Sequence, residues 1–170
     1  MNAPHFVNRV RDIASDILCP PEDSFCARLD TDGYRIVTTL DWTMQQAADK
    51  WAAAVLAADM KDPAPYLAAL GVPKVDWIAK IKKTNLHNAA IATLDARTGD
   101  VLAYTGSADY YATSSSPAFQ PQFDVLNAYR QPGSAIKPLV YAYALQERAI
   151  TPSTLFMDVP VDFGEGWTPA

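Results

Sequence analysis

The sequence is poor in several kinds of residue that functional sites often use. Its 170 residues include only two histidines and two cysteines, and no run of about 20 apolar residues that could cross a bilayer. Positive charge is not in excess either, because 14 lysines and arginines stand against 19 aspartates and glutamates, for a net charge of −5. A mildly acidic chain lacks the field that holds a phosphate backbone, so nucleic acid is not expected as a partner.

Sequence signatures of metal and phosphate binding are missing as well. The chain has no P-loop, no dinucleotide-binding glycine pattern, no H-E-x-x-H and no G-x-S-x-G. We therefore expect neither a cofactor nor a metal ion. What the sequence does have is apolar residues, 49% against 19% charged, which is enough to exclude a disordered chain.

The two cysteines lie close together in a turn-rich stretch. Cys19 and Cys26 flank the residues PPEDSF. A disulfide could close this short loop in an oxidising compartment. Two unpaired thiols fit the spacing equally well, because sequence alone does not give the distance between the two Cα atoms.

The N-terminal half shows helical patterns on either side of a candidate strand. Apolar residues recur at helical spacing over residues 4–18, which predicts an amphipathic helix. Residues 34–40, YRIVTTL, are rich in β-branched residues and predict a strand. Asp41 or Thr43 is expected to cap the helix that follows. The apolar stripe of that helix, which should face the core, comprises Met44, Ala47, Ala48, Trp51, Val55 and Ala58.

The second half is predicted to contain a hairpin and one more helix. Residues 89–94 and 101–105 have the composition of two strands joined by a short turn that contains Gly99. Residues 106–122 are expected to form a long surface loop, and such loops are often functional. Residues 135–147 predict a buried, largely apolar helix.

One short motif brings a hydroxyl and an amine together. Ser134 and Lys137 are three residues apart, so on a helix their Cβ atoms would lie about 5–6 Å from each other. A lysine amine can activate a serine hydroxyl if apolar neighbours bury the amine and keep it neutral. Pro132 and Gly133 would place Ser134 at a helix N-terminus, where free N–H groups stabilise an oxyanion. Taken alone, the motif is common, and a serine cap with an ordinary surface lysine is the simpler explanation.

The flanks of the motif resemble a known family. Residues 129–145, YRQPGSAIKPLVYAYAL, and QFDV before them resemble the nucleophile region of penicillin-binding proteins, in particular the transpeptidase domain of the bifunctional, class A type. The resemblance covers residues 31–170, and residues 1–30 resemble the connector helix and linker that precede this domain. Further matching residues follow the family's order: VTTLD at 37–41 with Gln45, AAIATLD at 89–95, Thr98 and Gly99, VLA at 101–103, and Pro152, Asp158 and Pro160.

The resemblance implies an α+β fold of the penicillin-binding and β-lactamase type, an antiparallel sheet with helices on its faces. It implies that Ser134 attacks the D-Ala-D-Ala end of a peptidoglycan stem peptide, forms an acyl-serine intermediate and passes the acyl group to an amine, with Lys137 as the base. β-Lactams would acylate the same serine. The parent protein would act on the extracytoplasmic side of the bacterial cell membrane, anchored by a segment that this sequence does not include.

The sequence departs from the family after Ser134. No S-x-N and no K-T-G motif follows, and the similar tripeptide Arg97-Thr98-Gly99 precedes the serine and suits a hairpin turn. We therefore expect the N-terminal part of a transpeptidase domain, truncated after the nucleophile helix. Alone it should be inactive, because such catalytic groups act as a unit. The missing C-terminal half or self-association would cover its open strand edges.

Two other functions stay open. The first is a non-catalytic scaffold or interaction module on the same fold. The second is a Ser-Lys hydrolase such as a β-lactamase.

Overall fold

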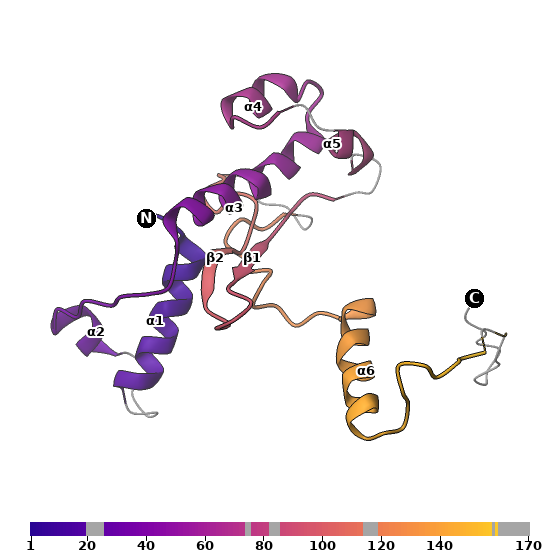
Figure 1. Cartoon of the computed structure of the whole chain (residues 1–170). Helices are drawn as coiled ribbons and strands as arrows, with labels where there is room; N and C mark the ends of the chain where they lie inside the picture. The colour runs from indigo at the N-terminus through magenta and orange to yellow at the C-terminus, as the bar shows by residue number, and fades with distance from the viewer. Residues whose placement is uncertain (20–25, 74–75, 82–85, 114–118, 158, 160–170) are drawn as a thin grey trace, which may run out of the picture. The chain divides into compact units, whose positions relative to one another are not determined.

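The computed structural model describes residues 1–19, 26–73, 76–81, 86–113, 119–157 and 159 (Figure 1). The chain divides into two units, Met1–Ala128 and Tyr129–Ala170. The first unit combines a two-stranded antiparallel sheet with helices, and the second contains the helix that begins at Lys137. The predicted α+β class is confirmed at this level. None of the helices in the described parts of the chain combines the length and the apolar character that a membrane span requires.

The N-terminal helix α1 (Pro4–Leu18) has the predicted bounds. It begins with a proline, which loses nothing there because the first N–H groups of a helix have no partner within it. Only its first turn is buried, through His5 and Phe6. The Phe6 ring packs against Tyr104 with ring centroids 6.4 Å apart, so α1 is held to the sheet by its N-terminal end.

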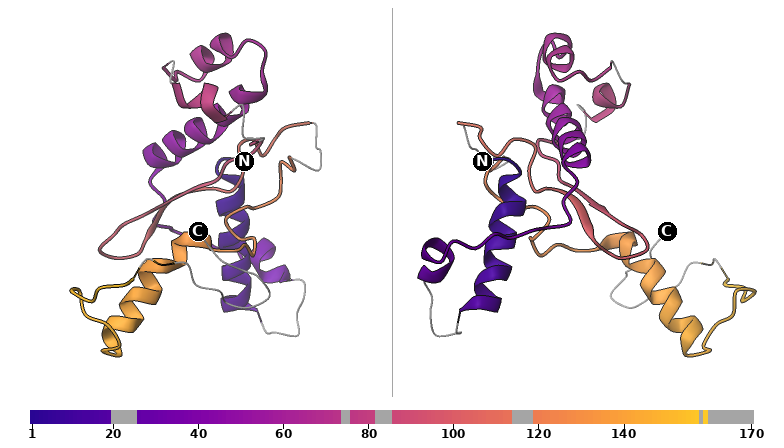
Figure 2. Two further views of the ribbon diagram at one scale, coloured as in Figure 1. Left: turned by 90° about the vertical axis from the view of Figure 1, so that its right-hand side faces the viewer. Right: turned by 60° about the vertical axis from the view of Figure 1, so that its left-hand side comes forward.

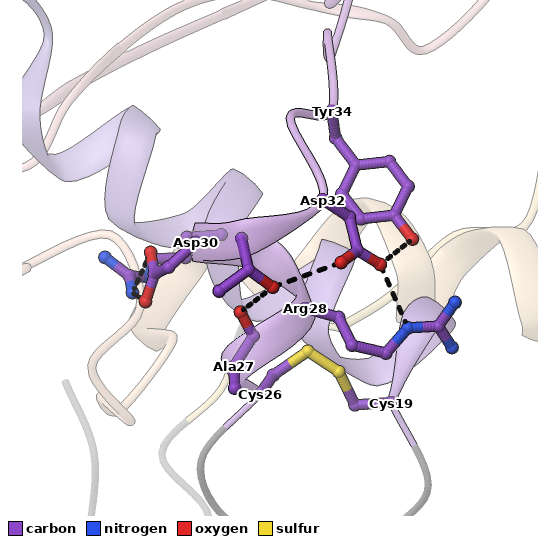
Figure 3. The surroundings of a disulfide bond; sticks show 9 residues. Cys19, Cys26, Ala27, Arg28, Asp30, Asp32 and Tyr34 are labelled. Atoms are coloured by element: carbon purple, nitrogen blue, oxygen red, sulfur yellow. Dashed lines mark hydrogen bonds and ion pairs between the residues drawn. A yellow bond between two sulfur atoms is a disulfide. The ribbon is translucent and has the colours of Figure 1, made fainter.

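A disulfide joins the end of α1 to the next helix. Cys19 follows α1, Cys26 precedes α2 (Ala27–Thr31), and their Cα atoms are 5.8 Å apart (Figure 3). An Arg11 guanidinium nitrogen of α1 also donates to both carboxylate oxygens of Asp30 in α2, at 2.9 and 3.0 Å. The structure thus contains the disulfide, one of the two alternatives that the spacing left open.

The strand predicted over residues 34–40 is not formed. These residues have no regular secondary structure. In the described part of the chain, hydrogen bonds to the hairpin are found only at the end of this segment. The Thr39 hydroxyl donates to the Val101 carbonyl at 2.8 Å, and the N–H of Asp41, the residue after the segment, donates to the Leu102 carbonyl at 2.9 Å. The prediction was wrong because β-branched composition favours a strand only where a neighbouring strand pairs along its length.

Helix α3 (Trp42–Ala54) begins as predicted at an Asp41 cap, whose carboxylate accepts the Met44 N–H at 2.9 Å. It continues as the 3₁₀ turn η1 (Val55–Asp59). The expected apolar stripe is buried only in part: Ala48, Val55 and Ala58 are buried. Met44 and Trp51 are exposed, whereas Gln45, which lies outside the stripe, is completely buried. Small residues beside this glutamine let α3 approach β2 closely. The buried residues of α3 are Gln45, Ala48, Ala52 and Ala54.

Another core lies at the C-terminal end of α3. Helices α4 (Ala64–Ala69) and α5 (Asp76–Ile81) contribute to it, and its buried members are Ala54, Ala57, Leu67, Val72 and Ile78.

The predicted hairpin is confirmed. Strand β1 (Ile91–Leu94) pairs antiparallel with β2 (Val101–Thr105), and α3 packs near the end of β2 that is remote from the turn (Figure 2). The tripeptide Arg97-Thr98-Gly99 forms the turn itself. The Asp95 carboxylate accepts the N–H groups of Arg97 and Thr98, at 2.8 and 3.1 Å, and Gly99 has a φ of 79°, which suits glycine.

The second unit contains the 3₁₀ turn η2 (Gly133–Ile136) and helix α6 (Lys137–Gln146). The predicted helix exists, but the expectation that it is buried was wrong, because none of its residues is buried. Its apolar residues lie on all sides, so covering them would need neighbours on all sides, and the described residues of this unit do not supply them. Asp158 and Pro160, matched to the family by sequence, lie outside the described residues.

Candidate active site

Ser134 lies in a tight turn that leads directly into α6. Gly133 opens this turn with a φ of 51°, in the left-handed region that glycine adopts without strain. The N–H of Lys137 donates to the Ser134 carbonyl, which makes the turn 3₁₀ rather than α-helical. Pro138 explains this choice, because it has no N–H to make the α-helical bond to the same carbonyl.

The two side chains of the motif are not joined by a hydrogen bond. Both Ser134 and Lys137 are exposed, and among the described residues no hydrogen bond joins the serine hydroxyl to the lysine amine. The apolar side chains that follow are exposed too, with Leu139 at 69% and Val140 at 55% of their full accessible area. The apolar cover expected around the lysine is therefore missing from this part of the chain. The two groups remain one turn apart at the beginning of α6.

A polar cluster in the first unit was missed by sequence reasoning. His5 is buried, and its Nε2 lies 3.0 Å from the hydroxyl of Ser107, which in turn donates to the Pro121 carbonyl at 2.5 Å. Burial lowers the pKa of His5, and the nearby Asp124 carboxylate opposes this shift. Because the Ser107 proton is directed at a carbonyl and the residue is buried, this pair is a structural link between α1 and the loop after β2. The signal that could have revealed it is a histidine within an otherwise apolar helix start.

Asp124 is the centre of the same cluster. The Tyr104 hydroxyl donates to it at 2.9 Å, and burial, followed by this hydrogen bond, raises the pKa of Tyr104 to about 12. Gly106 separates Asp124 from His5, and a Cβ there would lie 2.6 Å from an Asp124 oxygen and 2.7 Å from the His5 ring. The close packing of these groups requires glycine at this position.

A cavity of about 450 Å³ adjoins this cluster within the first unit. It lies between the start of α1, α3 and the residues after β2, and its polar lining includes His5, Gln45, Asp49, Thr105 and Ser107. In the part of the chain that the structure describes, no three histidine, cysteine or acidic side chains gather in a way that would hold a metal ion.

Comparison with known proteins identifies relatives of the segment that contains Ser134. The sequence model of the penicillin binding protein transpeptidase domain matches residues 89–169. Penicillin-binding protein 1A of Neisseria gonorrhoeae is 38% identical over 90 residues, which are 49% of this chain and 10% of that protein. Penicillin-binding protein 1A of Rickettsia bellii is 38% identical over 80 residues, which are 46% of this chain and 9% of that protein.

Neisseria cinerea provides a third relative, a penicillin-binding protein 1A that is 37% identical over 99 residues, 55% of this chain and 11% of that protein. The matched part thus spans about a tenth of the length of these curated relatives. No solved structure matches the chain significantly. The matched residues include the hairpin, Ser134, Lys137 and α6. Residues 89–169 therefore match the penicillin binding protein transpeptidase domain, and about half of the chain is similar to penicillin-binding protein 1A.

Proposed function

We propose that this chain is the nucleophile-bearing part of a peptidoglycan D,D-transpeptidase. The observation that carries the proposal is the position of the Ser134-x-x-Lys137 motif, which lies inside the matched residues 89–169 and at the beginning of α6. In this proposal residues 1–30 are a connector and residues 31–170 belong to the transpeptidase domain.

The reaction proceeds in two transfers of one acyl group. Ser134 Oγ attacks the carbonyl carbon between the two terminal D-alanines of a stem peptide, and the neutral amine of Lys137 takes the hydroxyl proton. The carbon–nitrogen bond to the last D-alanine then breaks, and the departing amine takes up a proton. An amine of a neighbouring strand attacks the resulting ester, which forms the cross-link and returns the proton to Ser134. A β-lactam acylates Ser134 in the same way as the stem peptide does in the first transfer, but the opened ring stays attached to the serine.

The described geometry supports reactivity only in a completed domain. Ser134 is exposed and so can be reached by a substrate, but its hydroxyl makes no hydrogen bond to Lys137. No S-x-N or K-T-G motif follows Ser134 in the sequence. Since groups of this kind act as a unit, we propose that the chain alone is inactive. Its partners are then a polypeptide that supplies these motifs and covers α6, or a second copy of the chain, together with stem peptides and β-lactams.

The Cys19–Cys26 disulfide supports a location outside the cytoplasm. Disulfides persist in oxidising compartments and are rare in the reducing cytosol, and this one joins α1 to α2. The location fits a protein that acts on peptidoglycan at the extracytoplasmic side of the membrane. We propose that a membrane anchor of the parent protein holds the domain there.

One observation favours a second function. Because Ser134 and Lys137 are exposed and no hydrogen bond joins their side chains, a non-catalytic interaction module on the same fold is the alternative. A chimera separates the two functions: residues 89–169 replace the matching segment of Neisseria gonorrhoeae penicillin-binding protein 1A, and release of D-alanine from a stem pentapeptide is measured.

We expect the chimera to release D-alanine and its Ser134→Ala version to release none. A folded chimera, judged by a cooperative thermal transition, that releases no D-alanine would favour the interaction module. If the larger exchange does not fold, a second chimera carries only residues 129–146 of this chain. Release of D-alanine is measured on it in the same way.

A further inference from the structure

The side chain of Gln45 makes the hydrogen bonds to one residue of β2 that a neighbouring strand would make. Its Oε1 accepts the Tyr104 N–H at 2.8 Å, and its Nε2 lies 3.3 Å from the Tyr104 carbonyl oxygen, to which it donates. The amide thus bonds both main-chain groups of a single residue. Gln45 has no exposed surface, so water does not compete for these bonds.

The register of the hairpin shows which edge of β2 is involved. Tyr104 lies opposite Ala92 of β1. In an antiparallel pair, the main-chain groups of alternate residues point toward the partner strand or away from it. Because the Tyr104 groups are bonded to Gln45, they lie on the outer edge of β2. The Leu102 carbonyl, two residues earlier on the same edge, accepts the Asp41 N–H at 2.9 Å.

Two neighbours fix the orientation of the Gln45 amide. Its Nε2 has two hydrogens for three acceptors: an Asp49 carboxylate oxygen at 2.8 Å, the Thr105 hydroxyl at 3.0 Å and the Tyr104 carbonyl at 3.3 Å, so one hydrogen is shared and the Tyr104 contact is the longest. The Thr105 hydroxyl donates to the same Asp49 oxygen at 2.7 Å. A carboxylate only accepts hydrogen bonds, so the nitrogen faces Asp49 and the amide oxygen is left to face Tyr104.

We propose that Gln45 is a positioning residue that closes the outer edge of β2 in place of a strand. The sheet can then grow only at the outer edge of β1, where the N–H and C=O of Ala92 point away from β2. This corrects the expectation that both edges of the hairpin are open. The inference rests on the first unit alone and holds whether or not Ser134 is a nucleophile.

Hydrogen exchange at single amides tests the proposal on the whole chain. In Gln45→Leu, the Tyr104 amide should exchange at least about tenfold faster relative to the unaltered chain, because its acceptor is gone. The amides of Ala103 and Thr105, which point toward β1, should keep their protection. Gln46→Leu, an exposed neighbour on the same helix, is the matched control and should leave all three amides unchanged. Unchanged protection of Tyr104 in Gln45→Leu would overturn the proposal.

Gln45→Glu keeps the test decisive if the leucine variant loses the fold. It retains an acceptor for Tyr104 but places a second carboxylate beside Asp49, and acidification restores a donor when one of the two takes up a proton. We expect the protection factor of Tyr104 in this variant to be reduced at pH 7.5 and to rise toward that of the unaltered chain at pH 5. A protection factor that matches the unaltered chain at both pH values, or that stays equally reduced at both, would contradict the assigned role.

Discussion

At the scale of single residues, the polar groups of this chain fall into two kinds. Gln45 is buried and bonded to Asp49, Thr105 and Tyr104, and His5 is buried and bonded to Ser107. Within the described residues no buried side-chain polar atom lacks a hydrogen bond. Ser134 and Lys137 are exposed, and no hydrogen bond joins their side chains. Buried and satisfied polar groups specify one arrangement of the chain, whereas the exposed pair needs further residues to fix its geometry.

His5 leads to a pH-dependent stability. Burial lowers its pKa from the ordinary value of 6.5, so the folded state binds fewer protons than the unfolded state below that pH. Stability is therefore full above pH 6.5 and falls as the pH drops below it, by at most about 1.4 kcal/mol per pH unit for one proton. The groups facing the ring are Ser107, Tyr110, Asp124 and Asp49.

Urea unfolding of the chain and of His5→Gln between pH 7.5 and 5.5 measures this effect. The difference in unfolding free energy between the two should shrink as the pH falls, because only the histidine is penalised by protonation. A difference that is constant over this range would show that His5 does not titrate in the expected direction.

At the scale of elements, sequence signals correctly predicted helix ends and turns, because these features depend on residues close together in the chain. The bounds of α1, a cap at Asp41 or Thr43 and the turn at Gly99 were all predicted from sequence. The buried side of α3 was assigned correctly only in part, because a glutamine was not expected to be completely buried in an amphipathic helix. Its partners are main-chain groups of β2, 59 residues away, and no local pattern reveals such a pairing.

The cap of α3 gives an element-scale prediction. Asp41→Ala removes the acceptor of the Met44 N–H and should lower the free energy of unfolding by about 0.5–2 kcal/mol. Asp41→Asn keeps a side-chain oxygen at the cap and should lie close to the unaltered chain. Both retain the Asp41 N–H that bonds Leu102. Chemical denaturation of the three chains checks the order, and equal losses for alanine and asparagine would contradict the capping role.

At the scale of the whole molecule, the exposed apolar residues of the second unit need covering. Among the described residues, the large apolar side chains at least 40% exposed on and after α6 are Leu139, Val140, Tyr141, Tyr143, Leu145, Leu155, Phe156, Met157 and Val159. Soluble monomers rarely leave so large an apolar group uncovered. The helix was predictable from sequence but its exposure was not, because burial depends on segments that the pattern of α6 does not encode.

The isolated chain should therefore associate with itself as its concentration rises. Size-exclusion chromatography with light scattering from 1 to about 100 µM checks this. Leu139→Glu together with Tyr143→Glu should weaken the association, because charge replaces exposed apolar surface. A chain that stays monomeric and melts cooperatively at every concentration would show that these residues need no partner.

From sequence, the candidate site was found as a pair of residue types at a spacing, together with the resemblance of its flanks to a known family. Its helix position is confirmed, since Ser134 lies in the turn that leads into α6. The contact between hydroxyl and amine could not be deduced, because it requires groups that surround the lysine and come from other segments of a domain.

Covalent labelling by penicillin is the most direct test that Ser134 is the nucleophile. In the chimera with Neisseria gonorrhoeae penicillin-binding protein 1A, tryptic digestion and mass spectrometry should place the penicilloyl group on the peptide spanning residues 131–148, which holds Ser134 because Pro138 blocks cleavage after Lys137. Ser134→Ala and Lys137→Ala should both abolish the label at neutral pH, and the chain of 170 residues alone should take up none. A label on another residue of the grafted segment, or labelling of Lys137→Ala at a near-normal rate, would contradict the account.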